Sequence, residues 1–397
     1  VESSIQDRVP MQTPQDMTCE STQCGRSVFT CILVLCFYSI VSTWVMAAEP
    51  FGVCVLDPSD NQVRHLLVQP EADTVVVTEK KPLPLSGRPH AITSNHHNQS
   101  MIVTLSSENG GSSALTIFRD SDGAFNPTRT TTLENSTGFI RVDRTGRFFL
   151  STSYRDGHVD VYAINENGCV GEHVCHQDVP GTFAHCVVTD ASNRFLYVPC
   201  VKEHNGLYQF SFNEKTGDVR RLDPFNAKPP ALFGPRHLAH HPQLPVLYSS
   251  NEQQLGVSVY KIEQNGQLTA IHHVMSLPRR SPYTRGERGM HASDLVVSHD
   301  GRYLFLAVRD FVGDEDSVFT FRIHADGRLS QIARKHVGDI PWSLALSPDQ
   351  SVLLVSEAHA KTLAFLPVRA DGSLGKAFRM EFGTEFRNMT VHEVSAR

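Results

Sequence analysis

Short apolar runs recur along this chain at intervals of about fifty residues, and each recurrence has the same internal order. Two apolar runs flank a turn rich in Gly, Asn or Asp, and a third run follows. The equivalent turn positions are Gly146, Asn193, Leu244, Gly301 and Gln350, which lie 47 to 57 residues apart. None of these runs has the 3.6-residue periodicity of a helix. A repeat of this length, made of short β-runs, is typical of propeller blades.

The order of runs within one repeat predicts the strands of a blade. The run before the turn, such as 185–190, is the innermost strand, 194–199 is the type of the second, and 257–262 is the type of the third. Asn-Gly or Asp-Gly pairs at 167–168, 265–266, 326–327 and 371–372 then turn the chain into a fourth strand. The pattern therefore predicts an all-β fold of four-stranded antiparallel blades.

Chain length sets the number of blades. The roughly 350 residues that follow position 48 accommodate seven blades of about fifty residues each. Six repeats are visible from His90 onward, so we expect the seventh blade to combine residues 51–80 with the C-terminal residues 376–394. This closure would make residues 49–397 a single seven-bladed β-propeller domain with no exposed sheet edges.

Residues 1–48 have a different character. Val28 to Met46 is almost uncharged and mostly apolar, and small residues follow it at Ala47 and Ala48. This extension is typical of a signal peptide, and its length would also suit a membrane anchor. We expect an exported protein, periplasmic or extracellular after cleavage, or one anchored to a membrane by this segment. If the extension is a misassigned start, the protein is cytoplasmic.

Charge and cysteine content indicate which classes of binding partner to expect. The net charge is −6 and the 36 basic residues are spread through the chain, so no basic stripe for nucleic acid is present. No heptad pattern or isolated apolar patch indicates self-association, and we expect a monomer. Five cysteines follow the extension, without CxxC or Cys/His metal spacing, and we expect no metal and no cofactor. They are Cys54, Cys169, Cys175, Cys186 and Cys200.

Antiparallel pairing predicts which side chains meet. The start of each inner strand and the end of each second strand lie on the same face of the disc, around one mouth of the central channel. Positions eight residues before the turn are His185, Arg236, Ser293 and Trp342, and those eight after it are Tyr154, Glu252 and Arg309.

Charged residues in such a cavity indicate either chemistry or a structural lock. Two arginines could hold a carboxylate or phosphate, or stabilise an oxyanion, while His185 or Glu252 transfers protons. The structural alternative is a histidine packed in the wall and an Arg236–Glu252 ion pair that only joins neighbouring strands.

An arginine-rich connection, residues 279–289, opens onto the same predicted mouth. Arg285 and Arg288 could recruit an anionic substrate there, although most charge clusters of this kind are solvated surface. The histidine pairs at 96–97, 240–241 and 272–273 have no spacing that would bring three ligands to one metal.

Four segments resemble the lactonase family of seven-bladed propellers, which includes the bacterial 6-phosphogluconolactonase and the cycloisomerase-2-like fungal carboxy-muconate cyclase. They are FAHCVVTDASNRFLYVP (183–199), GPRHLAHHP (234–242), LYSSNE (247–252) and HASDLVVSHDGRYLF (291–305). The resemblance implies a catalytic cleft with a His, the Arg of PRH, the Glu of NE and a further Arg. These correspond to His185, Arg236, Glu252 and Arg309.

Two cavity positions depart from the family pattern. Asp294-Leu295-Val296 lacks the second polar residue common in relatives, and Trp342 stands where many have arginine. With Asp294 and Tyr154 as further substrate-binding candidates, the sequence favours a lactonase acting on a small anionic sugar lactone, such as 6-phosphogluconolactone. The alternatives are a lactone-forming muconate-type cycloisomerase and a non-catalytic exported propeller that binds a protein or glycan.

Overall fold

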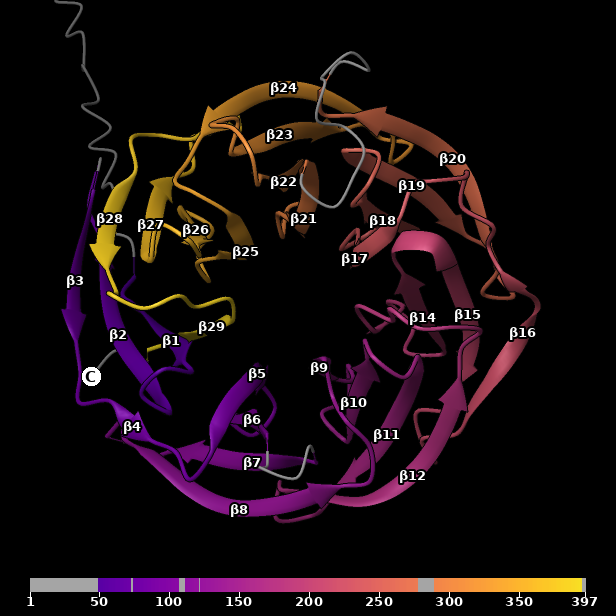
Figure 1. Cartoon of the computed structure of the whole chain (residues 1–397), viewed down its shortest axis with the longest axis horizontal. Coiled ribbons are helices and arrows are strands. Elements are labelled where there is room, and N and C mark those ends of the chain that lie inside the picture. Colours follow the sequence, from indigo (N-terminus) through magenta and orange to yellow (C-terminus); the bar gives the residue numbers. More distant parts are fainter. Residues whose placement is uncertain (1–48, 73, 107–110, 121, 278–288, 395–397) are drawn as a thin grey trace, which may run out of the picture. The chain divides into compact units, whose positions relative to one another are not determined.

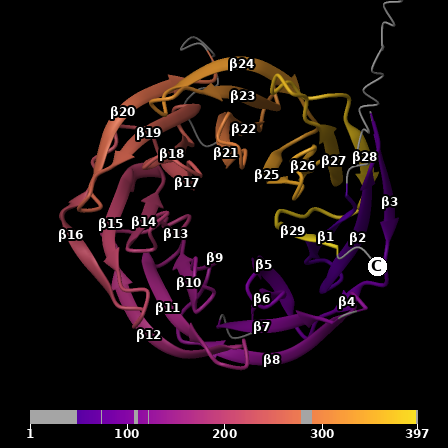
Figure 2. The same cartoon turned by 180° about the vertical axis from the view of Figure 1, so that it is seen from behind.

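The computed structural model describes residues 49–72, 74–106, 111–120, 122–277 and 289–394. Within them the chain forms seven antiparallel sheets and one short 3₁₀-helix, η1 (Lys202–His204). The sheets follow one another around a ring, and the chain passes from the centre of the ring outward in each of them (Figures 1 and 2). The predicted all-β, seven-bladed propeller is confirmed.

Six blades are continuous in sequence, and we number them in chain order. Blade 1 contains β5 (Arg88–Asn95), β6 (Ser100–Ser106), β7 (Ser112–Arg119) and β8 (Phe125–Leu133). Blade 2 contains β9 (Phe139–Val142), β10 (Phe148–Ser153), β11 (His158–Ile164) and β12 (Val170–Asp178). Blade 3 contains β13 (Val188–Thr189), β14 (Phe195–Cys200), β15 (Gly206–Phe212) and β16 (Val219–Asn226).

The next three blades repeat this order. Blade 4 contains β17 (Pro235–His240), β18 (Val246–Asn251), β19 (Gly256–Ile262) and β20 (Leu268–Met275). Blade 5 contains β21 (Met290–Val297), β22 (Tyr303–Asp310), β23 (Ser317–Ile323) and β24 (Leu329–His336). Blade 6 contains β25 (Pro341–Leu346), β26 (Val352–Glu357), β27 (Thr362–Pro367) and β28 (Phe378–Glu381).

Blade 7 joins the two ends of the propeller. Its innermost strand is the C-terminal β29 (Met389–Glu393), which pairs with β1 (Phe51–Asp57), so that Phe51 lies opposite Glu393. The blade continues outward through β2 (Gln62–Pro70) and β3 (Val75–Glu79), and the short β4 (Leu83–Pro84) also pairs with β2. The predicted closure is confirmed with one correction. Residues 378–381 form the outer strand of blade 6, because the Asp371-Gly372 turn directs the chain back along β27.

Burial explains why each repeat adopts this order. Every residue of the second strands β10, β14, β18, β22 and β26 is buried, since these strands are covered by neighbouring blades on both faces. The outer strands consist mostly of partly buried and exposed positions, because no further strand covers them on the outside. Hydrophobic clusters between adjacent blades therefore hold the ring together.

The turns between first and second strands connect neighbouring blades. Gly146, Asn193, Gly301 and Gln350 have the positive φ angles that tight turns require. Asn193 also donates a hydrogen bond of 2.7 Å to Asp143 of the preceding blade. Leu244 does not share this conformation.

Two further observations concern the N-terminal extension and the cysteines. The predicted signal peptide or anchor, residues 1–48, lies outside the described residues. Within the described part of the chain, the structure has no helix of sufficient length and hydropathy to cross a membrane. The five cysteines that follow are free thiols, and burial raises the pKa of both Cys54 and Cys200 to about 12.

Candidate active site

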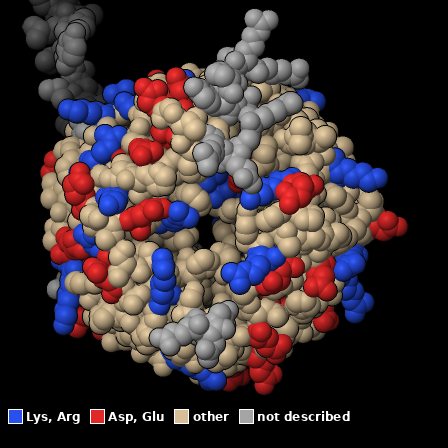
Figure 3. Space-filling view, viewed as in Figure 1, with Lys and Arg blue, Asp and Glu red and all other residues tan. Residues whose placement is uncertain are grey.

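A cavity of about 1040 Å³ occupies the centre of the ring. The space-filling view shows the hollow, with Lys and Arg side chains close to its opening (Figure 3). Seven residues predicted from strand geometry or from the resemblance line this cavity: Tyr154, His185, Arg236, Glu252, Asp294, Arg309 and Trp342. The strand register therefore brings side chains from five blades to one place.

Three predicted positions do not belong to this set. Ser293 is fully buried, and its hydroxyl donates a hydrogen bond of 2.7 Å to the carbonyl oxygen of Pro341. It therefore joins two inner strands and does not line the cavity. Arg285 and Arg288 lie outside the described residues.

β-Bulges near the start of the inner strands decide which side chains face the cavity. In β17, Pro235 pairs with Asn251 and Leu238 pairs with Ser249, so Arg236 and His237 together oppose one residue of β18. The same two-against-one arrangement occurs in β21 at residues 293 and 294, and in β25 at residues 342 and 343. A bulge re-aims side chains relative to a regular strand. As a result both Arg236 and His237 line the cavity, and Asp294 lines it in place of Ser293.

Arg236, Glu252 and Arg309 form the charged centre of the site. Glu252 Oε2 lies 3.0 Å from Arg236 Nε and 3.6 Å from Arg309 Nη2. Arg236 is fully buried, yet its Nη1 and Nη2 have no hydrogen-bond partner among the described residues. A buried guanidinium with free donors beside a cavity has the chemistry needed to bind an anion or a polarised carbonyl oxygen.

The electrostatics make Glu252 a counterion. Burial alone would raise the pKa of Glu252, but a hydrogen bond with His291 and the charges of Arg236 and Arg309 outweigh burial and lower it far below its usual value. Glu252 is therefore ionised at neutral pH and is a weak base. Burial, together with repulsion from Arg236, lowers the pKa of Arg309 to about 9.

His185 lies in the wall of the cavity with its ring 5.5 Å from Tyr154 and 5.0 Å from His237. Its backbone N–H donates a hydrogen bond to Pro199. Burial, followed by repulsion from Arg236 and His237, lowers the pKa of His185 well below its usual value. The imidazole is therefore neutral, and its buried Nδ1 has no hydrogen-bond partner among the described residues.

A second histidine is better placed to exchange protons. His237 Nδ1 lies 2.7 Å from Asp294 Oδ1, and Asp294 Oδ2 accepts a hydrogen bond from the backbone of Leu344. Burial and the charge of Arg236 lower the pKa of His237, while Asp294 opposes this effect. A carboxylate on Nδ1 orients the ring and leaves Nε2 as the proton acceptor. Sequence reasoning named Asp294 as a substrate-binding candidate but missed His237, because the bulges that turn both residues toward the cavity leave no mark in the hydrophobic pattern.

Trp342 contributes an aromatic surface between cations. Its ring centre lies 4.5 Å from the guanidinium carbon of Arg309 and 4.0 Å from that of Arg387. Arg387 precedes β29 and was also missed, because it belongs to the segment that closes the ring. His291 is a further addition, since its Nδ1 lies 3.4 Å from Glu252 Oε1.

Comparison with known proteins places the chain in a family. A family model described as "Lactonase, 7-bladed beta-propeller" matches residues 61–382. The chain belongs to this lactonase family. The match spans six of the seven blades in full and includes every cavity residue discussed above except Arg387.

Relatives and solved structures agree with this assignment. The chain is 29% identical over 288 residues to the 6-phosphogluconolactonase of Yersinia pestis (strain Pestoides F), covering 72% of this chain and 80% of that protein. It is 32% identical over 209 residues to the 6-phosphogluconolactonase of Erwinia tasmaniensis, covering 52% of this chain and 59% of that protein. The periplasmic gluconolactonase of Pseudomonas aeruginosa shares the fold of this lactonase family member, with a TM-score of 0.75 and 19% identity, covering 87% of this chain and 100% of that chain.

Proposed function

We propose that this protein hydrolyses a sugar lactone in the central cavity. The observation that carries the proposal is the guanidinium of Arg236, which is fully buried beside the cavity with both terminal nitrogens uncommitted in the described structure. Leaving such donors unpaired in the interior is costly. A substrate oxygen that gains negative charge during the reaction would supply the missing acceptor.

Each cavity residue then has a defined role in the hydrolysis. His237, oriented by Asp294, accepts a proton from water as the water oxygen bonds to the ring carbonyl carbon. The carbonyl oxygen becomes an oxyanion that Arg236 and Arg309 stabilise. The bond to the ring oxygen then breaks, His237 returns its proton to the departing alkoxide, and a hydroxy acid results. Glu252 keeps both guanidinium groups in place, and neutral His185 offers a further hydrogen bond to the substrate.

The charge of the cavity supports an anionic substrate. Arg141, Arg144 and Arg387 line it in addition to Arg236 and Arg309, whereas its carboxylates are Glu252 and Asp294. This balance suits a lactone that carries a phosphate group, in agreement with relatives named 6-phosphogluconolactonase. The apolar segment at 28–46 and the likeness to a periplasmic gluconolactonase support export of the enzyme.

The experiment compares lactones with and without the phosphate. Purified protein is mixed with freshly prepared 6-phosphogluconolactone or gluconolactone in weak buffer, and acid release above the spontaneous rate is followed. We expect enzyme-dependent acid release with a higher kcat/KM for the phosphorylated lactone. A rate equal to spontaneous hydrolysis for both compounds would reject the proposal. Lactone formation from a carboxy-muconate would instead assign the cavity to a cycloisomerase.

A further inference from the structure

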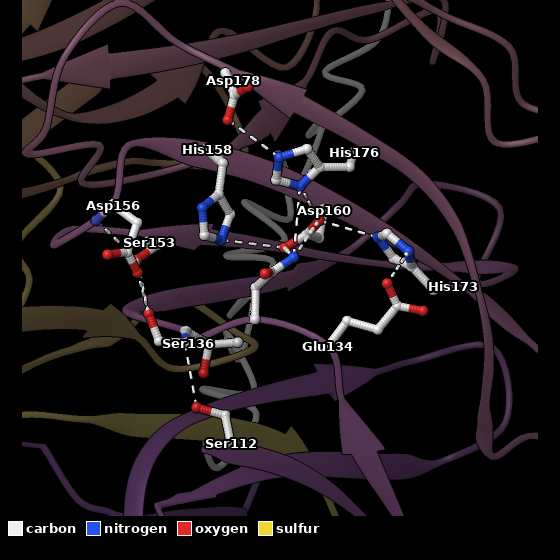
Figure 4. A network of polar contacts seen from close by, with 12 residues as sticks. Ser112, Glu134, Ser136, Ser153, Asp156, His158, Asp160, His173, His176 and Asp178 are labelled. Atoms are coloured by element: carbon white, nitrogen blue, oxygen red, sulfur yellow. Dashed lines mark hydrogen bonds and ion pairs between the residues drawn. The ribbon is translucent and has the colours of Figure 1, made fainter. Parts of the chain in front are cut away.

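A second cluster of ionisable groups lies away from the central cavity, on the outer strands of blade 2. The carboxylate of Asp160 in β11 is fully buried. Three imidazoles surround it (Figure 4): His176 Nδ1 at 2.7 Å and His173 Nε2 at 2.9 Å from Oδ1, and His158 Nε2 at 3.1 Å from Oδ2. None of these residues lines the cavity assigned to the lactonase reaction.

A β-bulge creates this cluster. In a regular strand, His173 and His176 would point to opposite faces, because side chains alternate with a period of two. Here Asp160 pairs with His176 and Tyr162 pairs with His173, so one extra residue of β12 is accommodated between them. The shift places both imidazoles on the face that also carries His158 and Asp160. The sequence alone therefore gave no sign of a site at this spacing.

The propeller repeat does not require these residues. The first residue of β11, His158, pairs with Ser153 of β10. The equivalent pairs are Cys200 with Gly206 in blade 3 and Asn251 with Gly256 in blade 4. Asp160 lies two residues after His158, and the residue two positions after Gly256 in blade 4 is Ser258. The cluster is thus specific to blade 2, where a fully buried charge needs a compensating cation.

Carboxylates also lie on the far sides of these two histidines. His173 Nδ1 lies 3.0 Å from Glu134 Oε2, and His176 Nε2 lies 3.1 Å from Asp178 Oδ1. With an N–H directed at each of these acceptors, His173 Nε2 and His176 Nδ1, which contact Asp160 in this structure, would be the ring atoms that ligate an ion. Metal-binding histidines characteristically donate their second ring N–H to a carboxylate in this way.

His158 provides an independent sign of a ligand. It is only 4% exposed, and its Nε2 is directed at the same carboxylate. Despite the distance of 3.1 Å, this nitrogen has no hydrogen bond of acceptable geometry among the described residues. His176 is 38% exposed in its side chain, so an ion can enter from solvent on that side.

We propose that Asp160, His173 and His176 bind one divalent transition-metal ion of the zinc type, beside His158, whose Nε2 lies 3.1 Å from the other carboxylate oxygen of Asp160. One donor atom from each of the three residues lies within 4.8 Å of the others. Tetrahedral zinc with ligands at about 2.0–2.1 Å needs donor separations of roughly 3.3 Å, which small side-chain rotations provide. Two imidazoles and a carboxylate suit zinc better than calcium or magnesium, which prefer oxygen ligands. The ion would tie β11 and β12 to Glu134, the residue that follows the outer strand of blade 1.

Metal titration of the full chain tests this proposal. The protein is stripped with a chelator, and binding of Zn²⁺ is measured by calorimetry and binding of Co²⁺ by visible absorption. We expect Asp160→Asn to weaken one binding event by at least about 100-fold, because losing a ligand costs more than the 10–100-fold typical of an outer partner. Zn²⁺ should raise the Tm of the wild type and leave that of the variant unchanged.

The control is His273→Gln in blade 4. His273 pairs with Ser258 just as His176 pairs with Asp160, and its Nδ1 lies 2.9 Å from the Ser258 hydroxyl. This variant should bind Zn²⁺ as the wild type does. If Asp160→Asn does not fold, the partly exposed His176→Gln replaces it with the same expectation. The proposal would be overturned if the wild type does not bind Zn²⁺, or if the blade 2 variant binds it with the affinity and stoichiometry of the wild type.

Discussion

Replacing Arg236 with methionine should remove most of the lactonase activity while leaving the fold nearly as stable as before. The substitution keeps the length and apolar character of the buried stem and deletes the guanidinium. Arg236 contacts Glu252 at 3.0 Å through Nε, but Nη1 and Nη2 are buried without partners among the described residues. The group therefore contributes little to the resting structure relative to what it can contribute to a bound oxyanion.

The magnitudes follow from these contacts. Removing one donor to a transition-state oxyanion lowers kcat by about 10²–10³, equivalent to about 2.7–4 kcal/mol. Breaking a buried ion pair from one side costs about 3–5 kcal/mol, whereas removing two buried unsatisfied donors recovers about 1–3 kcal/mol for each. Arg309 and His291 remain as partners of Glu252. The central values of the cost and the recovery are both about 4 kcal/mol and cancel, so the free energy of unfolding should change by less than about 2 kcal/mol.

A second arginine offers the contrasting control. Arg379 makes two hydrogen bonds to the fully buried carboxylate of Glu357, at 2.7 and 3.0 Å, and neither residue lines the cavity. Its side chain is 41% exposed, so Arg379→Met should lower the free energy of unfolding by about 3 kcal/mol, the lower end of the range for a broken buried pair. The remaining folded protein should keep its kcat.

Lactone hydrolysis and thermal or denaturant unfolding are measured on both variants. The expected pattern is opposite in the two: lost activity with retained stability for Arg236→Met, and retained activity with lost stability for Arg379→Met. If Arg236→Met instead loses stability and keeps wild-type turnover in its folded fraction, the Arg236–Glu252 pair is a structural lock and the reasoning is refuted.

Four further predictions address other residues. Because His237 must be neutral to accept a proton and its pKa lies below the usual value, kcat/KM should fall only below about pH 6.5. Asp294→Asn removes the group that raises this pKa, so it should lower kcat by about 10² and move the acid limb to lower pH; an unmoved limb contradicts the role of the pair. Burial, with Arg119 nearby, lowers the pKa of His65 to about 4 and that of His392 to about 3, so the unfolded state binds more protons between pH 6.5 and pH 4. The free energy of unfolding should therefore decrease as the pH is lowered across that window, and it should decrease less in His65→Leu. Denaturant unfolding at several pH values checks this, and an equal dependence on pH in the wild type and the variant would contradict it. Trp342 contacts two cavity arginines, so 6-phosphogluconate, the product that the proposed function implies, should change tryptophan fluorescence in the wild type and not in Trp342→Phe; an equal change in both would place its binding elsewhere.

The regular part of this protein follows from its sequence. Apolar runs with a period near fifty residues predict four-stranded blades, and antiparallel pairing then predicts that residues at equal distances from each turn converge at one end of the channel. His185, Arg236, Glu252 and Arg309 were placed together on this basis, and all four line the cavity. Strand pairing has a period of two and carries no ambiguity where the strand is regular, as at Arg309 in β22, whereas Arg236 lies in the bulge of β17 and faces the cavity together with His237.

The irregular part was decided only by the tertiary structure. Bulges in β17, β21 and β12 each add one residue to a strand, and the extra residue changes the face on which the following side chains lie. Asp294 therefore replaces Ser293 in the cavity and supports His237, and His173 joins His176 beside Asp160. A bulge depends on what the neighbouring strands and blades can accommodate, so the hydrophobic pattern does not reveal it. Ring closure is similar, because the position of Arg387 over Trp342 depends on β29 returning to β1 across the whole chain.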